Sequence, residues 1–538
     1  ITMAQSLISA PQPEAVEAGA RVLKKGGNAI DAAITCALVQ GVVDPQMCGV
    51  AGFGSLQLYM PNAGHHDCID FHGKAPSAVK DDMWQHLIEG EAPDGFGFIL
   101  KGQVNDVGYQ SVTIPGSLKA YFQAQTQHGT MAWADIVQPA IEWARRGSMV
   151  RPQMVHFWNV EDGSGRAQTR DRLRFSETGR RVYFNQDGSL KKLGQTLLNP
   201  DLAHCLTRIA QDGADVFYQG EIAEHIAADM ADQGGLLSLD DLKNYETTVS
   251  EPLWGTYRGF KLSTNQPPGG GVMLVEMLNM LEHFDLQKMG HNSTDYIRTV
   301  IEVMKRATSD KDNFVGDPAF VDVPLARLCS KEHAAAMAAA IKRGERGRVA
   351  RLNQVESSKT THVAVVDAAG NAVSMTHSLG MPSGVITNGL GFMYNGCMGV
   401  FDPRPGNADS LAPGKSRFSS LCPTIVFEDG KPCIVVGAPG GTQIAMGILQ
   451  SILNVIDHDM DMQQAVSAPR FSATSSAIDV SNRIPMDTTL PLEQAGYEVR
   501  RSPQSFAFSL VHGIQIRDGK MNGGADPGGD GMAMMVET

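Results

Sequence analysis

The stretch KTTHVAVVDAAGNAVSMTHS (359–378) holds the pattern from which the fold is worked out. Its first half alternates with a period of two over 361–366, and a second alternating run covers 372–378. This period predicts strands, and the AAGN between them is typical of a turn, so the segment predicts a β-hairpin. Threonine is common in strands. Thr360 is therefore either an ordinary strand residue or the first residue after a cut in the chain.

The composition is that of a globular protein with a large core. The 538 residues are 42% hydrophobic and 19% charged, which is an ordinary balance. The net charge is −13 and no basic stripe is present, so a nucleic-acid-binding protein is not expected. Eight cysteines without CxxC spacing argue against a disulfide framework. No apolar run reaches membrane-spanning length, so no membrane partner is expected.

No signal peptide is visible, which favours a cytoplasmic location. The chain begins at Ile1, and a leader removed before this residue would instead place the protein in the periplasm or outside the cell. The compartment is left open at this point.

Helical and strand patterns are distributed unevenly along the chain. Helices are predicted mainly in the first two thirds, at 13–25, 28–43, 116–149, 199–234, 273–284, 294–307 and 331–343. Strands dominate the last third, at 361–366, 372–378, 390–395, 421–427, 432–437, 506–517 and 532–536, with helices at 442–457 and 461–467. This distribution predicts a layered α+β fold rather than alternating βαβ units.

Two short motifs could carry chemistry. In GAPGG (437–441), Gly440 and Gly441 precede a predicted helix, and their N–H groups could hold a negative oxygen. Taken alone, such a segment is more often a simple turn between a strand and a helix. Ser419 and Ser420 precede a strand and could donate to a carboxylate or carbonyl, although such serines are more often turn residues.

Two other segments have the right residue types for chemistry but the wrong geometry. The adjacent histidines of GHHDC (64–68) point to opposite faces of a strand, so a shared metal is not expected. His377 and Ser378 are also strand neighbours that face apart, and no GxSxG elbow supports a serine hydrolase.

Taken together, these motifs resemble the γ-glutamyltranspeptidase family of N-terminal nucleophile hydrolases. The resemblance covers nearly the whole chain and rests on spaced motifs in the family's order. They are LKKGGNAIDAA (23–33), VTIPGSLKAY (112–121), NFVGDPAF (313–320), TTHVAVVDAAGNAVSMT (360–376), SSLCPTIV (419–426), GAPGG (437–441) and IDHDMDMQQAVSAPRF (456–471).

The resemblance implies a four-layer αββα sandwich and self-cleavage before Thr360. The products would be a large chain, 1–359, and a small chain, 360–538, which stay associated and could pair as a homodimer. A free N-terminal threonine would supply both the nucleophile and, in its amine, the base. No metal or organic cofactor is then needed.

The same resemblance implies roles for the motif residues. Gly440 and Gly441 would form the oxyanion hole, and Ser378 would hydrogen-bond the nucleophile. Ser419 and Ser420 would bind a substrate carboxylate.

The chain departs from the family pattern where a free amino acid is recognised. His72 replaces the arginine that pairs with the α-carboxylate, and Gly380, Cys397 and Val400 replace polar partners, including those that hold the α-amino group. We therefore predict an N-terminal threonine amidohydrolase or acylase that prefers simpler carboxy-acyl amides over γ-glutamyl amides. The acyl carboxylate would meet Ser419, Ser420 and a cation, either Arg404 or a protonated His72.

Two alternatives stay open. A true γ-glutamyltransferase or glutathione hydrolase could read its substrate through Arg404 or Arg417. An inert family member that never cleaves and only binds a partner is disfavoured by the intact Thr360, Gly440 and Gly441. The sequence leaves the acyl group, the acceptor and the oligomeric state undetermined.

Overall fold

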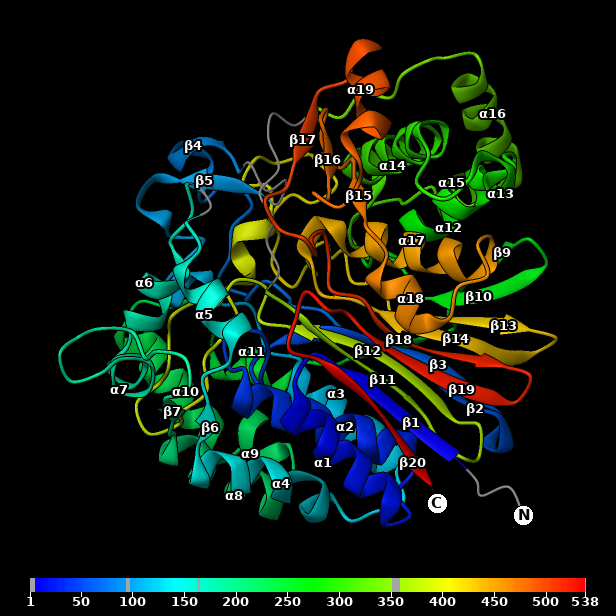
Figure 1. Ribbon diagram of the computed structural model, residues 1–538. Helices are drawn as coiled ribbons and strands as arrows, with labels where there is room; N and C mark the ends of the chain where they lie inside the picture. The colour runs from blue at the N-terminus through cyan, green and yellow to red at the C-terminus, as the bar shows by residue number, and fades with distance from the viewer. Residues whose placement is uncertain (1–4, 93–96, 162–164, 351–358, 538) are drawn as a thin grey trace.

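The computed structural model describes residues 5–92, 97–161, 165–350 and 359–537. Two β-sheets lie face to face, and helices cover the outer face of each, so the layers run helix, sheet, sheet, helix (Figure 1). This is the four-layer αββα arrangement predicted from the sequence.

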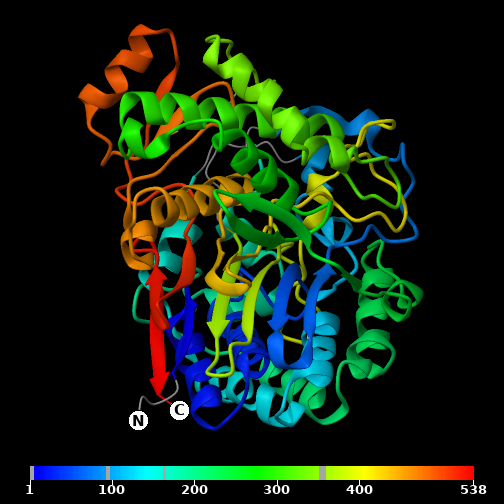
Figure 2. The same cartoon turned by 90° about the vertical axis from the view of Figure 1, so that its right-hand side faces the viewer.

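The first sheet is antiparallel throughout and has the predicted hairpin at its centre. In spatial order its strands are β20 (Met532–Glu537), β1 (Gln5–Ala10), β11 (Thr361–Val366), β12 (Ala372–Ser378), β2 (Phe53–Met60), β3 (His65–Phe71) and β8 (Thr248–Ser250). Because β1 pairs with β20, the two ends of the described chain lie side by side (Figure 2).

The second sheet is built mostly from the last third of the chain. Its spatial order is β19 (Lys520–Ala525), β18 (His512–Arg517), β14 (Lys431–Gly437), β13 (Thr424–Glu428), β10 (Phe260–Thr264) and β9 (Leu253–Tyr257). The face between the sheets is apolar and includes Ala364, Val366, Ile425, Val435 and Ile514. The alternation in β11 thus turns Ala364 and Val366 toward the second sheet and Val363 and Val365 toward the helices.

Helices pack on the outer face of each sheet. The first sheet is covered by α1 (Pro13–Lys24), α2 (Ala29–Val43), α3 (Ser117–His128), α4 (Trp133–Arg146) and α8 (Pro200–Asp212). The second is covered by α12 (Gly271–Leu281), α14 (Thr294–Phe314), α17 (Ile444–Ile456) and α18 (Met462–Ser467). Helix α2 begins with a capping box between Asn28 and Asp31, and almost all of its residues are buried, because the layer of α1 and α4 covers it.

The remaining elements lie around this sandwich. The further helices are α5 (Pro152–Asn159), α6 (Thr169–Arg174), α7 (Glu177–Tyr183), α9 (Asp215–Tyr218), α10 (Glu221–Asp232), α11 (Leu239–Lys243), α13 (Leu286–Met289), α15 (Leu325–Leu328), α16 (Lys331–Lys342) and α19 (Met486–Gln494). Short strands form three small sheets, from β4 (Ile88–Glu91) and β5 (Phe98–Leu100), β6 (Ser148–Met149) and β7 (Thr196–Leu197), and β15 (Phe471–Ser472), β16 (Ile478–Val480) and β17 (Val499–Arg501). Within the described ranges, none of the helices combines the length and apolar character needed to cross a membrane.

One predicted strand is wrong. Residues 390–395 form turns and an irregular segment instead, with Gly389 and Gly391 in the left-handed region at φ +85° and +77°. A side chain at Gly391 would lie 2.2 Å from the backbone nitrogen of Leu202, so the segment is fixed by close packing against α8 rather than by a strand ladder. In the two large sheets, strands β1, β8, β9, β10 and β19 were not predicted.

Candidate active site

Thr360 lies at the head of β11, next to the end of β12, and is 9% exposed. Its Oγ1 lies 2.9 Å from Oγ of Ser378. The strand register places Thr361 opposite His377, so Thr360 and Ser378 meet just beyond the last paired residues of the hairpin. The predicted pair is therefore brought together by the hairpin itself.

The direction of this hydrogen bond follows from proton counting. Oγ of Ser378 lies 2.7 Å from the carbonyl oxygen of Lys359 and accepts from the N–H of Gly380 at 2.7 Å. A hydroxyl has one proton, and the carbonyl can only accept, so the Ser378 proton goes to Lys359. The Thr360 hydroxyl must then donate to Ser378. The threonine oxygen is thus held with its lone pairs available, beside the carbonyl that precedes it.

The neighbouring residues of the hairpin are fixed within the core. Thr361 donates to Oε1 of Gln12 at 3.0 Å and accepts from Nε2 of Gln40 at 3.0 Å. His377 contacts the Tyr121 hydroxyl through Nδ1 and Oε1 of Gln40 through Nε2. Burial lowers the pKa of His377 to about 3, so its imidazole is neutral. These groups hold the end of the hairpin in position. The His377 imidazole bonds to Tyr121 and Gln40 rather than to Thr360.

Most of the predicted site residues line a single pocket. Its walls include Thr360, Ser378, Gly380, Val400, Ser419, Ser420 and Gly441. Ser419 and Ser420 come from the segment before β13, and the Ser419 N–H donates to the carbonyl of Pro268 at 2.9 Å. Residues far apart in the sequence therefore converge at one end of the sandwich.

The glycine pair occupies a tight turn between β14 and α17. Gly440 has φ +145° and Gly441 has φ +58°. A side chain at Gly440 would lie 2.8 Å from Cα of Ser509, whose hydroxyl donates to the carbonyl of Pro439 at 2.7 Å. Glycine is needed here because of both the close approach and the positive φ. Gly441 lines the pocket, and Gly440 precedes it in the turn.

The structure does not support the two cations suggested for the acyl carboxylate. His72 is 4% exposed, and burial, with Arg417 and Lys74 nearby, lowers its pKa to about 3, so a protonated His72 is ruled out near neutral pH. Arg404 pairs with Asp402 through Nε at 3.0 Å and Nη2 at 2.8 Å, and its guanidinium lies 4.5 Å from the centre of the Phe98 ring. Neither side chain is among those that line the pocket.

Two buried arginines line the pocket instead. Nη1 of Arg166 donates to Oδ1 of Asp106 at 3.2 Å. Burial alone would raise the pKa of Asp106, but the charges of Arg172 and Arg166 have the larger combined effect and lower this pKa to about 2. Arg417 is 5% exposed, and its guanidinium lies 4.6 Å from the centre of the Phe53 ring. The sequence had suggested Arg417 only for the γ-glutamyltransferase alternative, and Arg166 was missed because nothing near it in the chain marks it as a pocket residue.

Arg417 occupies the space next to the positions that depart from the family pattern. Its Nη1 lies 3.0 Å from where a Gly380 side chain would begin. Burial raises the pKa of the Cys397 thiol, and the adjacent Arg417 guanidinium opposes this. The carboxyl of Asp409 is also near: burial raises its pKa to about 7, while Lys415, Arg417 and Lys311 oppose this. Gly380 and Cys397 thus leave room for a cation in the pocket.

A threonine at a strand head, a paired hydroxyl on the neighbouring strand and a glycine turn at the end of an αββα sandwich define an N-terminal-nucleophile type of hydrolase. Comparison with known proteins agrees, since residues 15–536 match the gamma-glutamyltranspeptidase family. The chain belongs to this family. It is therefore an amide hydrolase or acyltransferase of the gamma-glutamyltranspeptidase type.

Some relatives are named acylases and others are named glutathione hydrolases. The chain is 35% identical over 509 residues to an acylase ACY 1 proenzyme from Pseudomonas sp. (strain V22), covering 94% of this chain and 88% of that protein. It is 33% identical over 550 residues to a glutathione hydrolase proenzyme from Escherichia coli (strain K12), covering 97% and 90%. The structure of a cephalosporin acylase from Bacillus halodurans superposes with a TM-score of 0.86 at 26% identity, covering 99% of this chain and 96% of that one.

Proposed function

We propose that the chain cuts itself between Lys359 and Thr360 and that Thr360 then acts as the nucleophile of an amidohydrolase. The hydrogen bonds around Ser378 support this proposal. Its proton is directed at the carbonyl oxygen of Lys359, which polarises the carbonyl, while the Thr360 hydroxyl is held beside it. The relatives named as proenzymes are also consistent with cleavage.

The chemistry of the cut balances without a co-reactant other than water. Oγ1 of Thr360 adds to the carbonyl carbon of Lys359, and the threonine proton passes to the departing amide nitrogen. The C–N bond breaks and leaves an ester between Lys359 and Thr360. Water hydrolyses the ester to give the Lys359 carboxylate, the Thr360 hydroxyl and a free Thr360 amine. That amine, with a reference pKa of roughly 7.7–8.0, is then the general base for substrate turnover.

The cut predicts two bands on a denaturing gel. In proportion to residue number, the 57.8 kDa chain gives fragments of about 39 and 19 kDa, and the smaller one should begin TTHVAV. Thr360→Ala should remain one chain, because it lacks the attacking oxygen, whereas Thr360→Ser should still be cut. An active wild type that stays a single band would overturn the proposal.

We further propose that the preferred acyl group carries one carboxylate and no neighbouring ammonium. The observation behind this choice is the buried guanidinium of Arg417 in the pocket wall, beside Gly380 and Cys397. A substrate ammonium 4 Å from a guanidinium costs about 4 kcal/mol at the effective dielectric of a partly buried site. A carboxylate in the same place gains a charge-assisted hydrogen bond, and Ser419 and Ser420 line the same pocket.

Substrate preference tests this proposal directly. Glutaryl-p-nitroanilide and γ-glutamyl-p-nitroanilide differ only in the ammonium, and kcat/KM should favour the glutaryl compound. Arg417→Met should lower kcat/KM for the glutaryl compound at least tenfold, about 1.4 kcal/mol, with Arg417→Lys in between. Arg404→Met is the matched control, because that arginine lies outside the pocket lining, and it should leave the preference unchanged.

A tenfold preference of the wild type for the γ-glutamyl compound would contradict the acyl-group proposal. The chain would then be assigned to the glutathione hydrolase type of its relatives, with other residues reading the amino acid. The self-cleavage proposal would stand or fall separately, on the gel.

A further inference from the structure

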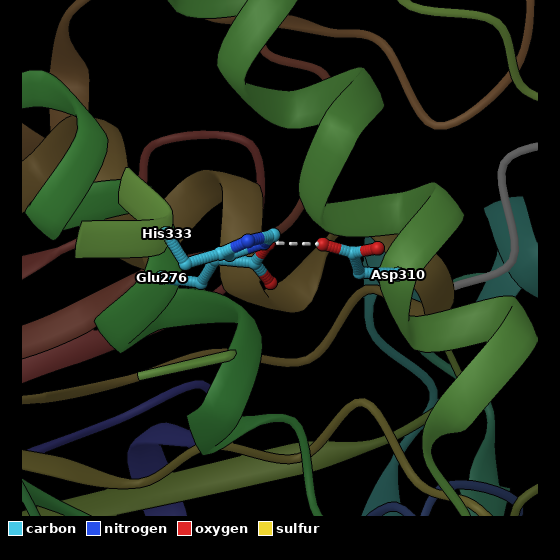
Figure 3. A group of neighbouring side chains, drawn as sticks. All are labelled: Glu276, Asp310 and His333. Atoms are coloured by element: carbon cyan, nitrogen blue, oxygen red, sulfur yellow. Dashed lines mark hydrogen bonds and ion pairs between the residues drawn. The ribbon is translucent and has the colours of Figure 1, made fainter. Parts of the chain in front are cut away.

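A cluster of three ionisable side chains joins three helices on the outer layer, away from the pocket. Glu276 comes from α12, Asp310 from α14 and His333 from α16, and Figure 3 shows the three side chains pointing toward one another. Nε2 of His333 lies 2.9 Å from Oδ2 of Asp310 and 3.5 Å from Oε1 of Glu276. One ligand atom from each residue lies within 4.8 Å of the others. The proposed amidohydrolase chemistry uses none of the three.

Glu276 is the unusual member of the cluster. The residue is 1% exposed, and its Oε1 has no hydrogen-bond partner among the described residues. The contact of this oxygen with His333, at 3.5 Å, is longer than an ordinary hydrogen bond. Burial of an acid without a full set of partners is costly. The buried oxygen therefore contacts His333 but makes no ordinary hydrogen bond with the described residues.

The spacing of these atoms can accommodate a metal ion after a small adjustment. Zinc binds histidine nitrogen and carboxylate oxygen at roughly 2.0–2.2 Å, so two ligands of a tetrahedral site lie about 3.4 Å apart. The Glu276–His333 separation of 3.5 Å already matches this value. The His333–Asp310 separation of 2.9 Å needs to lengthen by about half an ångström.

We propose that Glu276, Asp310 and His333 bind one divalent cation of the zinc type, which ties α12, α14 and α16 together. One imidazole and two carboxylates suit borderline cations such as Zn²⁺, whereas Ca²⁺ takes six to eight oxygen ligands. Water would complete the coordination, as in other sites with three protein ligands. The role is structural, since the ion lies outside the pocket lining.

Helix α12 links the proposed ion site to the segment that holds Ser419 and Ser420. The N–H of Gly270, just before α12, donates to the carbonyl of Leu421 at 2.8 Å, and Pro268 accepts from Ser419. An ion that holds α12 against α14 and α16 therefore steadies the support of the Ser419–Ser420 segment.

The test is zinc binding to the chelator-treated full-length protein. Titration calorimetry with Zn²⁺ alone should show one site per chain, and Ca²⁺ should not compete. At a free zinc concentration one hundred times Kd, the melting temperature should rise by about 3 °C.

Glu276→Gln and Asp310→Asn should abolish the zinc response. Without zinc, Glu276→Gln should melt no lower than the wild type, because a neutral amide replaces a buried acid; this also shows that the variant folds.

A second histidine group provides the control. His65 and His128 both approach Asp67, at 4.0 and 3.8 Å, and the His128 side chain is 9% exposed, as is that of His333. His128→Gln should leave zinc binding at the proposed site intact. The proposal is overturned if the wild type binds no zinc, if binding survives both Glu276→Gln and Asp310→Asn, or if it is lost in His128→Gln.

Discussion

At the scale of single residues, the site depends on one hydroxyl with three neighbours. Ser378 accepts from Thr360 and from Gly380 and donates to Lys359. The same side chain therefore orients the proposed nucleophile and polarises the bond proposed to be cut. A single substitution should affect both events.

Ser378→Ala should slow self-cleavage and, once the chain is cut, lower kcat. Loss of a well-placed hydrogen bond to a reacting group typically reduces the rate by about 10²-fold or more, and the Thr360 hydroxyl would lose its described acceptor. Ser378→Thr keeps the hydroxyl and should retain more of both activities. The measurement is a time course on gels together with p-nitroanilide release. Cleavage and turnover at wild-type rates in Ser378→Ala would contradict the hydrogen-bond assignment.

At the scale of elements, the turn between β14 and α17 fixes the predicted oxyanion donors. Proline requires φ near −65°, and Gly441 has φ +58°, so a proline there would distort the turn rather than only remove a donor. A small side chain at Gly440 is a sharper probe, because it meets the backbone of Ser509.

Gly440→Ala should lower kcat at least tenfold while the protein stays folded. The added methyl group would lie 2.8 Å from Cα of Ser509, so the turn must shift and move its N–H groups away from the pocket. Gly430→Ala is the matched control: Gly430 also has a positive φ, +77°, in the turn between β13 and β14, but open space surrounds it. Equal activity of the two variants would show that the turn does not position a catalytic donor.

At the scale of the whole molecule, both sheets combine strands from the two sides of the proposed cut. β11 lies between β1 and β12, β12 pairs with β2, and β13 pairs with β10. Fragments 1–359 and 360–538 would therefore share both sheets and the core between them. Separating the fragments would expose this core, so they should co-purify without a covalent link.

The buried histidines make the stability of the whole molecule sensitive to acid. Burial lowers the pKa of His72 and His377 to about 3 and that of His512 to about 4. Between these values and the unfolded pKa of about 6.5, the unfolded chain binds protons that the folded chain does not. Stability contributed by these groups is therefore present above about pH 6.5 and is lost as the pH falls.

His72→Leu should reduce this acid sensitivity. Both ring nitrogens of His72 lack a hydrogen-bond partner among the described residues, and Nε2 lies 3.6 Å from Oδ1 of Asp70, so the change removes the titration without breaking a hydrogen bond. The slope of unfolding free energy between pH 6 and pH 4 should fall by up to about 1.4 kcal/mol per pH unit. Urea unfolding at several pH values measures it. An unchanged slope in His72→Leu would contradict the prediction.

Local patterns predicted most of the architecture. The predicted helix at 28–43 is α2, the hairpin is β11 and β12, and the helix at 331–343 is α16, each within one residue. These elements carry their own signals, namely period, caps and turn residues. Strand β1 was missed because it is short and because its partners, β11 and β20, lie hundreds of residues away in the sequence. The segment 390–395 looked like a strand because its apolar residues are spaced as in one, but the glycines and the contact with α8 decide otherwise.

The sequence by itself determined the family, because its short motifs stand in the family's order, and this resemblance implied the αββα layers and Thr360 as the proposed nucleophile. Only the tertiary structure decided which cation the pocket offers. His72 is neutral because packing removes water from around it, and Arg417 enters the pocket because Gly380 and Cys397 leave the space. The Glu276, Asp310 and His333 cluster exists only where three helices meet. Desolvation and the convergence of distant residues depend on the packed chain, and no local stretch of sequence encodes them.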